Sequence, residues 1–377
     1  MVDPLNDLRK YVDSCKKCGF CKAVCPVFRS SGYIETAGPR GRMLLLQGLL
    51  EGALKPNNYL SRRLHCTLCG YCSIKCVSGL ELTEAYLIGR HYLLSNGVVL
   101  PGIKDLISNV VSLGNPYGVG SGIKSMWIDF LEERPAKESK VIYFAGCTTA
   151  IRRPESAVAA YSLLKSIVGE VAIVEDEPCC HSPLYLAGDW SRFKEGVLKV
   201  IKSIKNAGGS VVVTTCPACT RSLREYARNV GVEHDLSVYH IVEYLRELLN
   251  QGRLPNLELE ATITYHDPCE LGRHMGIVRE PRELLNRIRG IKLVEMKASG
   301  LESNCCGGGG LYLPLDPEGS MSIAINRLND LPDGVKYLVT ACPSCEVQLS
   351  RAVQTVNLDI EVVDISEIVW RSLSRSN

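Results

Sequence analysis

The chain has 377 residues, of which 46% are hydrophobic and 22% charged, and these fractions are typical of a folded soluble protein. They exclude a disordered, fibrous or coiled-coil chain. The net charge is only +2, so no general attraction to nucleic acid is expected. The unusual feature is the presence of 18 cysteines.

The first seven residues are polar and acidic, and no basic region followed by an apolar stretch appears there. A secretory signal is therefore not expected, and we predict a cytoplasmic protein. In the cytoplasm, cysteines serve as metal ligands or redox groups more often than they form structural disulfides.

Two matching cysteine tetrads lie in the first 80 residues, each with the spacing C-x2-C-x2-C-x3-C. They are Cys15, Cys18, Cys21 and Cys25, and Cys66, Cys69, Cys72 and Cys76. In the bacterial-ferredoxin arrangement for [4Fe–4S] cubes, the fourth cysteine of each run ligates the other cluster. We therefore predict one cube on Cys15, Cys18, Cys21 and Cys76, and a second on Cys66, Cys69, Cys72 and Cys25. Zinc is the alternative, but it needs two C-x2-C pairs and not regular runs of four.

A helix is predicted between the tetrads, over residues 43–50, and residues 1–100 are predicted to form a small helical two-cluster domain. This region has 13 Lys and Arg against 7 Asp and Glu. Such a surplus offsets anionic clusters or steers an acidic redox partner, and Arg40 and Arg42 are candidates for this role.

Residues 101–139 are predicted to form a connector. They contain the longest uncharged run of the chain, residues 106–123, in which ten of the 18 residues are Gly, Pro, Ser or Asn. That composition breaks a helix and is too polar for lipid, so no transmembrane segment is expected.

The other ten cysteines form two pentads, each made of a single cysteine, a doublet and a C-x2-C pair. The first pentad is Cys147, Cys179, Cys180, Cys216 and Cys219, and the second is Cys269, Cys305, Cys306, Cys342 and Cys345. The doublet and the pair recur 126 residues later, which indicates an internal repeat. Adjacent cysteines form a strained disulfide, so we predict that each pentad binds metal. Zinc or buried core cysteines are the alternative, chiefly for the first pentad.

Short apolar runs precede the single cysteines and the pairs, and stretches of helical spacing follow them. Strands alternating with helices predict two α/β units with parallel sheets, over residues 140–257 and 258–377, with a hinge at 251–256. Ligand sites of such sheets gather at the carboxyl ends of the strands. The cysteines expected at those ends are Cys147, Cys216, Cys269 and Cys342.

The pentads resemble the CCG domains of heterodisulfide reductase, and the tetrads resemble its ferredoxin-type subunit. The presence of both on one chain is similar to the fused D subunit of that enzyme. Related chains serve as iron–sulfur subunits of glycolate, lactate and anaerobic glycerol-3-phosphate dehydrogenases. Shared motifs lie at residues 38–42, 115–118, 266–269 and 305–310. The resemblance implies an α+α/β fold and one or two noncubane [4Fe–4S] clusters, each held by five thiolates, that split a disulfide.

The first pentad departs from the family pattern, because His181 follows its doublet where Gly307 follows the second. Glycine lets a backbone or ligand approach closely, whereas the histidine fills that space or contacts a substrate. We therefore expect the second pentad to keep its access, and we assign the catalytic role to Cys269, Cys305, Cys306, Cys342, Cys345 and His266. Whether the first pentad holds a noncubane cluster or zinc stays open.

Several other residues have two interpretations. His266 and Asp267 either supply protons to a departing thiolate or orient the cysteine loop through hydrogen bonds. Arg273, His274 and Arg279 either meet an anionic substrate group or form a solvated helix start. Residues 307–310 are all glycine but lack the Lys-Ser/Thr of a phosphate-binding loop, so no nucleotide site is predicted.

The predicted function is an iron–sulfur oxidoreductase subunit that passes electrons through two cubanes to a disulfide or thiol substrate. The alternative is a pure electron-transfer subunit of a flavin-dependent dehydrogenase. The chain lacks a dinucleotide-binding G-x-G-x-x-G motif, so both functions require partners, either a flavoprotein or a membrane cytochrome or quinone-linked subunit. Such a partner would hold the protein at the inner face of the membrane.

Overall fold

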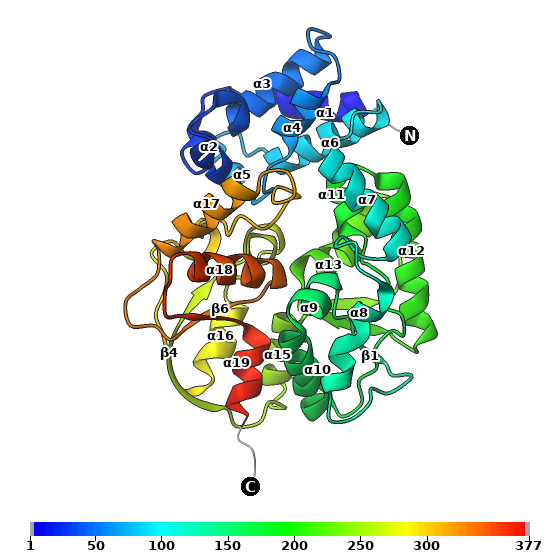
Figure 1. Cartoon of the computed structure of the whole chain (residues 1–377), viewed down its shortest axis with the longest axis vertical. Helices are drawn as coiled ribbons and strands as arrows, with labels where there is room; N and C mark the ends of the chain where they lie inside the picture. The colour runs from blue at the N-terminus through cyan, green and yellow to red at the C-terminus, as the bar shows by residue number, and fades with distance from the viewer. Residues whose placement is uncertain (1–3, 374–377) are drawn as a thin grey trace.

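The computed structural model describes residues 4–373. A helical N-terminal part lies above two α/β units, which lie side by side (Figure 1). The fold is of the predicted α+α/β class. Among the described residues, no helix combines the length and apolar content needed to cross a bilayer.

The N-terminal part consists of short helices joined by the cysteine loops. Its elements are α1 (Pro4–Ser14), η1 (Phe20–Lys22), α2 (Pro26–Ser30), η2 (Glu35–Ala37), α3 (Pro39–Leu50), α4 (Asn58–Leu64), α5 (Tyr71–Ile74) and α6 (Leu82–Ser95). The helix predicted over 43–50 begins earlier, because Pro39 provides a favourable first residue for α3. Helices α1, α3 and α6 pack around the buried side chains of Leu8, Leu46 and Tyr86.

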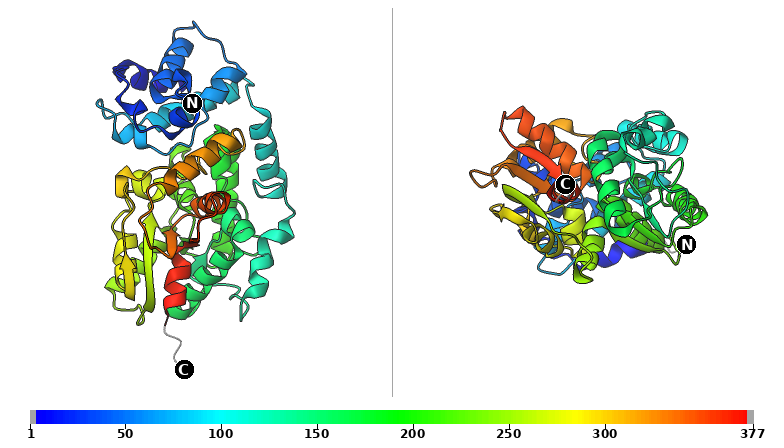
Figure 2. Two further views of the ribbon diagram at one scale, coloured as in Figure 1. Left: turned by 60° about the vertical axis from the view of Figure 1, so that its left-hand side comes forward. Right: turned by 90° about the horizontal axis from the view of Figure 1, so that it is seen from below.

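The connector descends along the side of the molecule to the first α/β unit (Figure 2). It contains α7 (Pro101–Leu113), α8 (Ser121–Ser125) and η3 (Met126–Phe130). Helix α7 packs against α11 of the first unit and ends at Gly114, whose φ of 67° is left-handed. The helix therefore ends near the middle of the uncharged run, as the Gly and Pro content of that run predicts.

The first α/β unit has a three-stranded parallel sheet in the order β1-β2-β3. The strands are β1 (Val141–Tyr143), β2 (Val211–Thr214) and β3 (Ser237–His240). The helical segments are α9 (Cys147–Arg152), α10 (Pro154–Val168), α11 (Ser182–Ala187), α12 (Trp190–Asn206), α13 (Pro217–Arg221), the π-helical turn η4 (Ser222–Tyr226), α14 (Ala227–Asn229) and α15 (Ile241–Asn250).

The second α/β unit repeats this plan with a four-stranded parallel sheet in the order β5-β4-β6-β7. The strands are β4 (Glu258–His266), β5 (Arg289–Leu293), β6 (Tyr337–Thr340) and β7 (Glu361–Asp364). The helical segments are the π-helical turn η5 (Glu270–His274), α16 (Glu280–Asn286), η6 (Gly300–Glu302), α17 (Pro317–Leu328), α18 (Pro343–Thr355) and α19 (Ile365–Ser372). At the position that β5 occupies in the second sheet, the first sheet has only isolated β-bridges, which Ala172 makes.

One hydrophobic core runs through both α/β units. Tyr143 and Tyr161 of the first belong to the same buried cluster as Tyr265 and Ile368 of the second, and α10 packs on α19. Leu254 of the predicted hinge is part of that cluster. A segment anchored in a shared core joins the units without acting as a free hinge.

Candidate metal centres

The thiols of the first tetrad and of Cys76 line one small cavity in the N-terminal part. Its cysteines are Cys15, Cys18, Cys21 and Cys76, and neither a carboxylate nor an imidazole lines it. Burial and the neighbouring thiols of Cys15, Cys76 and Cys18 raise the pKa of Cys21 to about 11. These four cysteines are the set that the crossed spacing assigns to one cube.

A second cavity is lined by the other crossed set, Cys25, Cys66, Cys69 and Cys72. All four are buried. Burial raises the pKa of Cys25, while the guanidinium of Arg42 acts in the opposite direction. The structure thus brings together both sets of four thiols, and cluster ligation by these sets stays a prediction.

The two tetrad loops share a backbone conformation. Lys17 and Leu68, each two residues after the first cysteine of its run, have φ values of 52° and 49°. Gly19 and Gly70, each four residues after it, have φ values of 88° and 73°. The left-handed φ values at equivalent positions bend both loops in the same way. The concave backbone that results is suited to binding anionic groups.

Two fully buried arginines flank the second tetrad without a carboxylate partner among their hydrogen bonds. Arg42 donates to the carbonyl of Arg63 and lies 4.0 Å from the Cys25 sulfur. Arg90 donates to the carbonyls of Leu64, Leu186, Gly310 and Cys66. Both side chains are only 1% exposed. Buried cations need a countercharge, and a thiolate-bound cluster in this cavity would supply one.

This burial changes the interpretation of the basic surplus. Arg40 lines the cavity of the first tetrad and remains partly exposed, so it fits a surface role. Arg42 is enclosed beside the second tetrad, where its charge would offset that of a bound cluster and cannot steer a partner.

The five thiols of the second pentad form a chain of neighbours at the carboxyl ends of β4 and β6. The order of neighbouring thiols is Cys269, Cys305, Cys306, Cys345 and Cys342. The sulfur atoms of Cys306 and Cys345 are 3.2 Å apart. Cys342 is the N-cap residue of α18. The first turn of this helix directs backbone N–H groups and the positive end of the helix dipole at the thiols of Cys342 and Cys345.

The first pentad has the same order of neighbours at the carboxyl ends of β1 and β2. Its chain is Cys147, Cys179, Cys180, Cys219 and Cys216. Cys216 caps α13 as Cys342 caps α18. Both repeats therefore gather five thiols in one topology, and the donor sets of both pentads fit a sulfur-ligated metal centre.

The backbone at His181 copies that of Gly307, and a neighbouring glycine provides space for its ring. The φ values are 61° and 85°, and each N–H donates to the first thiol of its doublet. A Cβ on Gly196 of α12 would lie 2.3 Å from the His181 ring. The histidine thus packs against α12, and its Nδ1 is buried without a hydrogen-bond partner.

The glycines at 307–310 allow backbone segments to touch. A Cβ on Gly307 would lie 2.4 Å from the Ser320 carbonyl oxygen, and one on Gly310 would lie 2.3 Å from the Cys66 carbonyl oxygen. These contacts give Gly307 and Gly310 a packing role, and the expectation that the second pentad keeps its access to substrate stays a prediction.

The second tetrad and the second pentad meet directly. The thiols of Cys69 and Cys305 are close neighbours, and the proximity of Cys305 together with burial raises the pKa of Cys69. Arg273 donates to the Cys69 carbonyl at 2.6 Å, and the His274 Nε2 lies 2.9 Å from the Leu68 carbonyl oxygen. Arg273 and His274 thus bind the tetrad loop and are not a solvated helix start, and the Arg273 Nη2 is buried without a hydrogen-bond partner. The exposed Arg279 does not join them.

His266 lies beside the second pentad in a hydrogen-bonded network. Its ring, Cys306 and Cys345 present ligand atoms within 4.8 Å of one another. Arg327 donates through Nε to the His266 Nδ1 at 3.0 Å, so the other ring nitrogen carries the hydrogen of the neutral ring. Burial and the nearby Arg327 guanidinium lower the pKa of His266.

Asp267 has a structural role in the same network. It accepts two hydrogen bonds from Arg282, at 2.7 and 2.9 Å, and one from the backbone of Gly300 at 2.8 Å. Its carbonyl accepts from Ser303, two residues before the doublet. Of the two interpretations of Asp267, orientation of the cysteine loops is the one that these contacts support.

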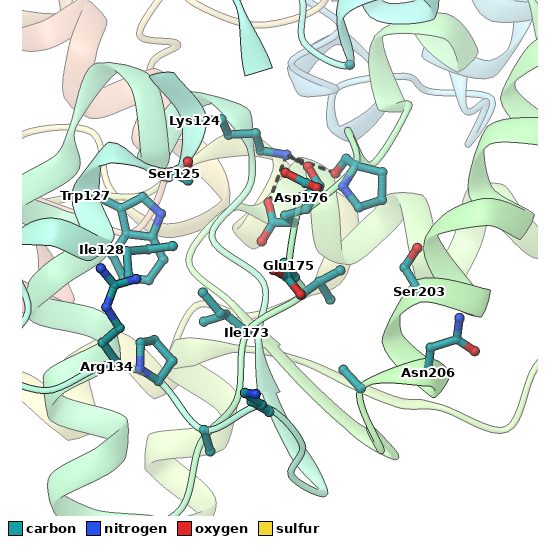
Figure 3. Close-up of a pocket in the computed structure, with 18 of the residues that line it drawn as sticks. Lys124, Ser125, Trp127, Ile128, Arg134, Ile173, Glu175, Asp176, Ser203 and Asn206 are labelled. Atoms are coloured by element: carbon teal, nitrogen blue, oxygen red, sulfur yellow. Dashed lines mark hydrogen bonds and ion pairs between the residues drawn. The ribbon is translucent and has the colours of Figure 1, made fainter. Parts of the chain in front are cut away.

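The connector covers the first pentad. Cys147 donates to the Gly114 carbonyl, and Lys124 binds the carboxylate of Glu177 and the carbonyls of Glu177 and Pro178. The Glu177 carboxylate accepts from the backbone N–H groups of Ala145 and Gly146, just before Cys147. Beside this ion pair lies a cavity of about 1020 Å³, bordered by Trp127, Ile173 and Asn206 among others (Figure 3).

Sequence patterns did not reveal Arg90, Arg327 or the Lys124–Glu177 pair. Their main partners lie far along the chain, so no local spacing marks them. Arg42 was a candidate from the sequence, and it lies in the shared motif at residues 38–42.

Comparison with known proteins identifies two domain families in the chain. The 4Fe-4S dicluster domain family matches residues 11–80, and the cysteine-rich domain family CCG matches twice, at residues 141–224 and 263–350. The fold and its thiol sites therefore define an iron–sulfur protein with one dicluster domain and two cysteine-rich domains.

Over 97% of its length the chain is 30% identical to the D subunit of dihydromethanophenazine:CoB–CoM heterodisulfide reductase from Methanosarcina acetivorans, covering 95% of that protein. The chain belongs to the family of heterodisulfide reductase D subunits. It is also 27% identical to the B subunit of fumarate reductase (CoM/CoB) from Methanothermobacter marburgensis, with 96% and 72% of the two chains covered. The probable glycolate oxidase iron–sulfur subunit of Bacillus subtilis is 26% identical, with 95% and 94% covered.

Proposed function

We propose that this chain is the iron–sulfur subunit in which a disulfide is reduced at the second pentad, with electrons arriving through the two tetrads. The overall change is R–S–S–R′ + 2 e⁻ + 2 H⁺ → R–SH + R′–SH, and the same site run in reverse oxidises two thiols. Membership of the family of heterodisulfide reductase D subunits supports this reaction class.

The observation that carries the proposal is the contact between Cys69 and Cys305. It joins the electron-carrying domain to the second pentad by neighbouring ligands, and no intervening layer of side chains separates them. [4Fe–4S] clusters, when bound, supply one-electron storage at the tetrads and iron that binds sulfur at the pentads.

The protein's own residues have distinct roles in this scheme. Cys269, Cys305, Cys306, Cys342 and Cys345 hold the metal centre. His266, oriented by Arg327, offers an N–H beside Cys306 and Cys345, where a thiolate product forms. Arg273 holds the tetrad loop against the doublet.

The first pentad is proposed to hold a second noncubane cluster, because it repeats the order of thiol neighbours found in the second. Zinc is the alternative there. The Gly114 carbonyl and the Lys124–Glu177 pair lie against it, and all five of its thiols are buried, whereas Cys269 of the second pentad is partly exposed.

A matched pair of variants tests the assignment. Cys305→Ser should abolish viologen-driven disulfide reduction and leave the paramagnetic signals of the tetrads. Cys179→Ser removes the equivalent thiol of the first pentad and should retain more turnover. Anaerobic iron, sulfide and zinc analysis of both proteins reports metal loss. Full turnover by Cys305→Ser would refute the proposal.

A second function is favoured by the similarity to the glycolate oxidase iron–sulfur subunit. In it the chain carries electrons for a flavin-dependent dehydrogenase partner and has no substrate of its own. A thiol added to the oxidised protein distinguishes the two. A thiol-dependent paramagnetic signal that is lost in Cys305→Ser supports disulfide chemistry, and its absence in the wild type supports electron transfer alone.

A further inference from the structure

The two tetrads differ sharply in their distance from solvent. Every thiol of the second set is buried, whereas Cys15, Cys21 and Cys76 of the first are partly exposed. All 18 cysteines lie within the described residues, and Cys18 is the one among them that is exposed, since the others are buried or partly buried. Because electron transfer between proteins requires close approach, the first tetrad is the natural point of entry.

Large apolar side chains surround this exposed thiol. Phe20 lies between Cys18 and Cys21 and is 66% exposed, and Val77 follows Cys76 and is 65% exposed. Both line the cavity of the first tetrad. Ile74, on the adjoining helix α5, is 44% exposed. Single exposed apolar residues are ordinary, but three gathered around a redox centre mark a contact surface.

The rim of this surface is basic. Lys16, Lys17, Arg40 and Lys75 line the same cavity, and no carboxylate does. Arg40 and Lys22 share Glu35, and Lys75 pairs with Glu302, so these cations are partly neutralised. Lys16 is exposed, and Lys17 donates to the Val12 carbonyl, which leaves its charge in place. The surface therefore has an apolar centre and a net positive border.

We infer that Phe20, Ile74 and Val77, bordered by Lys16 and Lys17, form the docking surface of an acidic electron-transfer protein. This entry surface rests on the proposed function, since it supplies the electrons used at the second pentad. Charge complementarity accelerates the encounter of such partners, and apolar contact around Cys18 brings the two redox centres close. Small contact areas with fast exchange are typical of redox partners.

The test uses the cluster-loaded protein and a reduced acidic [2Fe–2S] ferredoxin as the probe, with stopped-flow absorbance as the readout. Each reduced ferredoxin donates one electron. The wild-type rate constant should fall steeply as ionic strength rises. Lys16→Glu with Lys17→Glu should lower it about tenfold or more at low salt. Phe20→Ser with Val77→Ser should lower it at every salt concentration.

Matched controls lie on α12 of the first α/β unit, away from the tetrad loops. Leu198→Ser removes an exposed apolar side chain and Lys202→Glu reverses an exposed charge, and neither should alter the rate. Iron content and tetrad signals must match the wild type in every variant. A basic cytochrome c as electron acceptor should show no loss, or a gain, with the Lys→Glu pair.

The outcomes separate this inference from the proposed function. If ferredoxin rates are unaffected by the four substitutions, the docking surface is refuted, while viologen-driven disulfide reduction still tests the function independently. If Phe20→Ser with Val77→Ser instead abolishes binding to phosphatidylglycerol vesicles and leaves the ferredoxin rate unchanged, the surface binds lipid and the inference is wrong.

Discussion

The thiols of Cys69 and Cys305 are close neighbours although the two cysteines belong to different domains and are separated by 236 positions in the sequence. One is a proposed ligand of the second cube and the other a proposed ligand of the second pentad. A path through two adjacent ligands is short, so the protein needs no mobile carrier between these centres. The first pentad lacks an equivalent contact among the interactions of the described residues, so the two repeats differ in their position relative to the tetrads.

Arg273 maintains this relationship, because it donates to the carbonyls of Cys69, Leu301 and Ser303. We predict that Arg273→Ala slows electron transfer from the second tetrad to the second pentad and lowers the free energy of unfolding by about 2–4 kcal/mol, since buried carbonyls lose a charged donor. Rapid-freeze paramagnetic resonance after a pulse of reductant measures the first effect. Arg279→Ala, at an exposed site nearby, serves as the control. Equal transfer rates in both variants would contradict this role.

Arg42 and Arg90 should set the reduction potential of the second tetrad. Each places a buried positive charge beside a centre that gains negative charge on reduction, so Arg42→Gln or Arg90→Gln should shift that potential downward. Redox titration followed by paramagnetic resonance measures the shift. Arg40→Gln beside the solvent-exposed first tetrad should have a smaller effect, because water screens the charge. A shift of equal size at Arg40 would show that burial is not the cause.

The repeated spacing of the cysteines explains how much of the site was predictable. Regular runs such as Cys15 to Cys25 have a known local geometry, and alternating strands and helices place Cys147 and Cys269 at strand ends. These inferences use contacts between neighbours in sequence. The crossing of Cys25 and Cys76 was also accessible, since it is part of the ferredoxin pattern.

The remainder depends on contacts between distant segments. The approach of Cys69 to Cys305 requires three parts of the chain to be placed at once, and Arg90 joins all three through the Leu186, Gly310 and Cys66 carbonyls. The residues next to Arg90 in the sequence do not distinguish it from an arginine at the surface. The space for His181 is created by Gly196, a residue on another helix that no motif connects to it.

Gly310 should be sensitive to the smallest added side chain. A Cβ there would lie 2.3 Å from the Cys66 carbonyl oxygen. We predict that Gly310→Ala separates the second tetrad loop from the second pentad, costs at least about 1–3 kcal/mol of stability and slows disulfide turnover. Gly334→Ala is the matched control, because its φ of 72° resembles the 65° of Gly310 but no atom lies within 4 Å of the added Cβ. The difference between the two variants isolates the steric contact from backbone strain. Similar thermal midpoints and turnover in both would contradict the prediction.

Asp364 should make the stability of the protein depend on pH. It caps α19 at the junction of the two α/β units, and burial raises its pKa from 3.8 to about 7. The folded chain therefore binds a proton more tightly than the unfolded chain does. As pH rises from about 4 to about 7, ionisation costs the folded state free energy, so the free energy of unfolding should fall across that range and level off above it.

The variant Asp364→Asn tests this dependence, because the amide oxygen can still accept the cap hydrogen bonds from the Ser366 N–H and hydroxyl. We expect it to be more stable than the wild type at pH 8, by on the order of a few kcal/mol, and to lose much of the slope between pH 5 and pH 7. Anaerobic chemical denaturation of both cluster-loaded proteins, followed by circular dichroism at each pH, gives the comparison. Cluster lability in acid affects both proteins alike, so a parallel pair of pH profiles would show that Asp364 is not the titrating group.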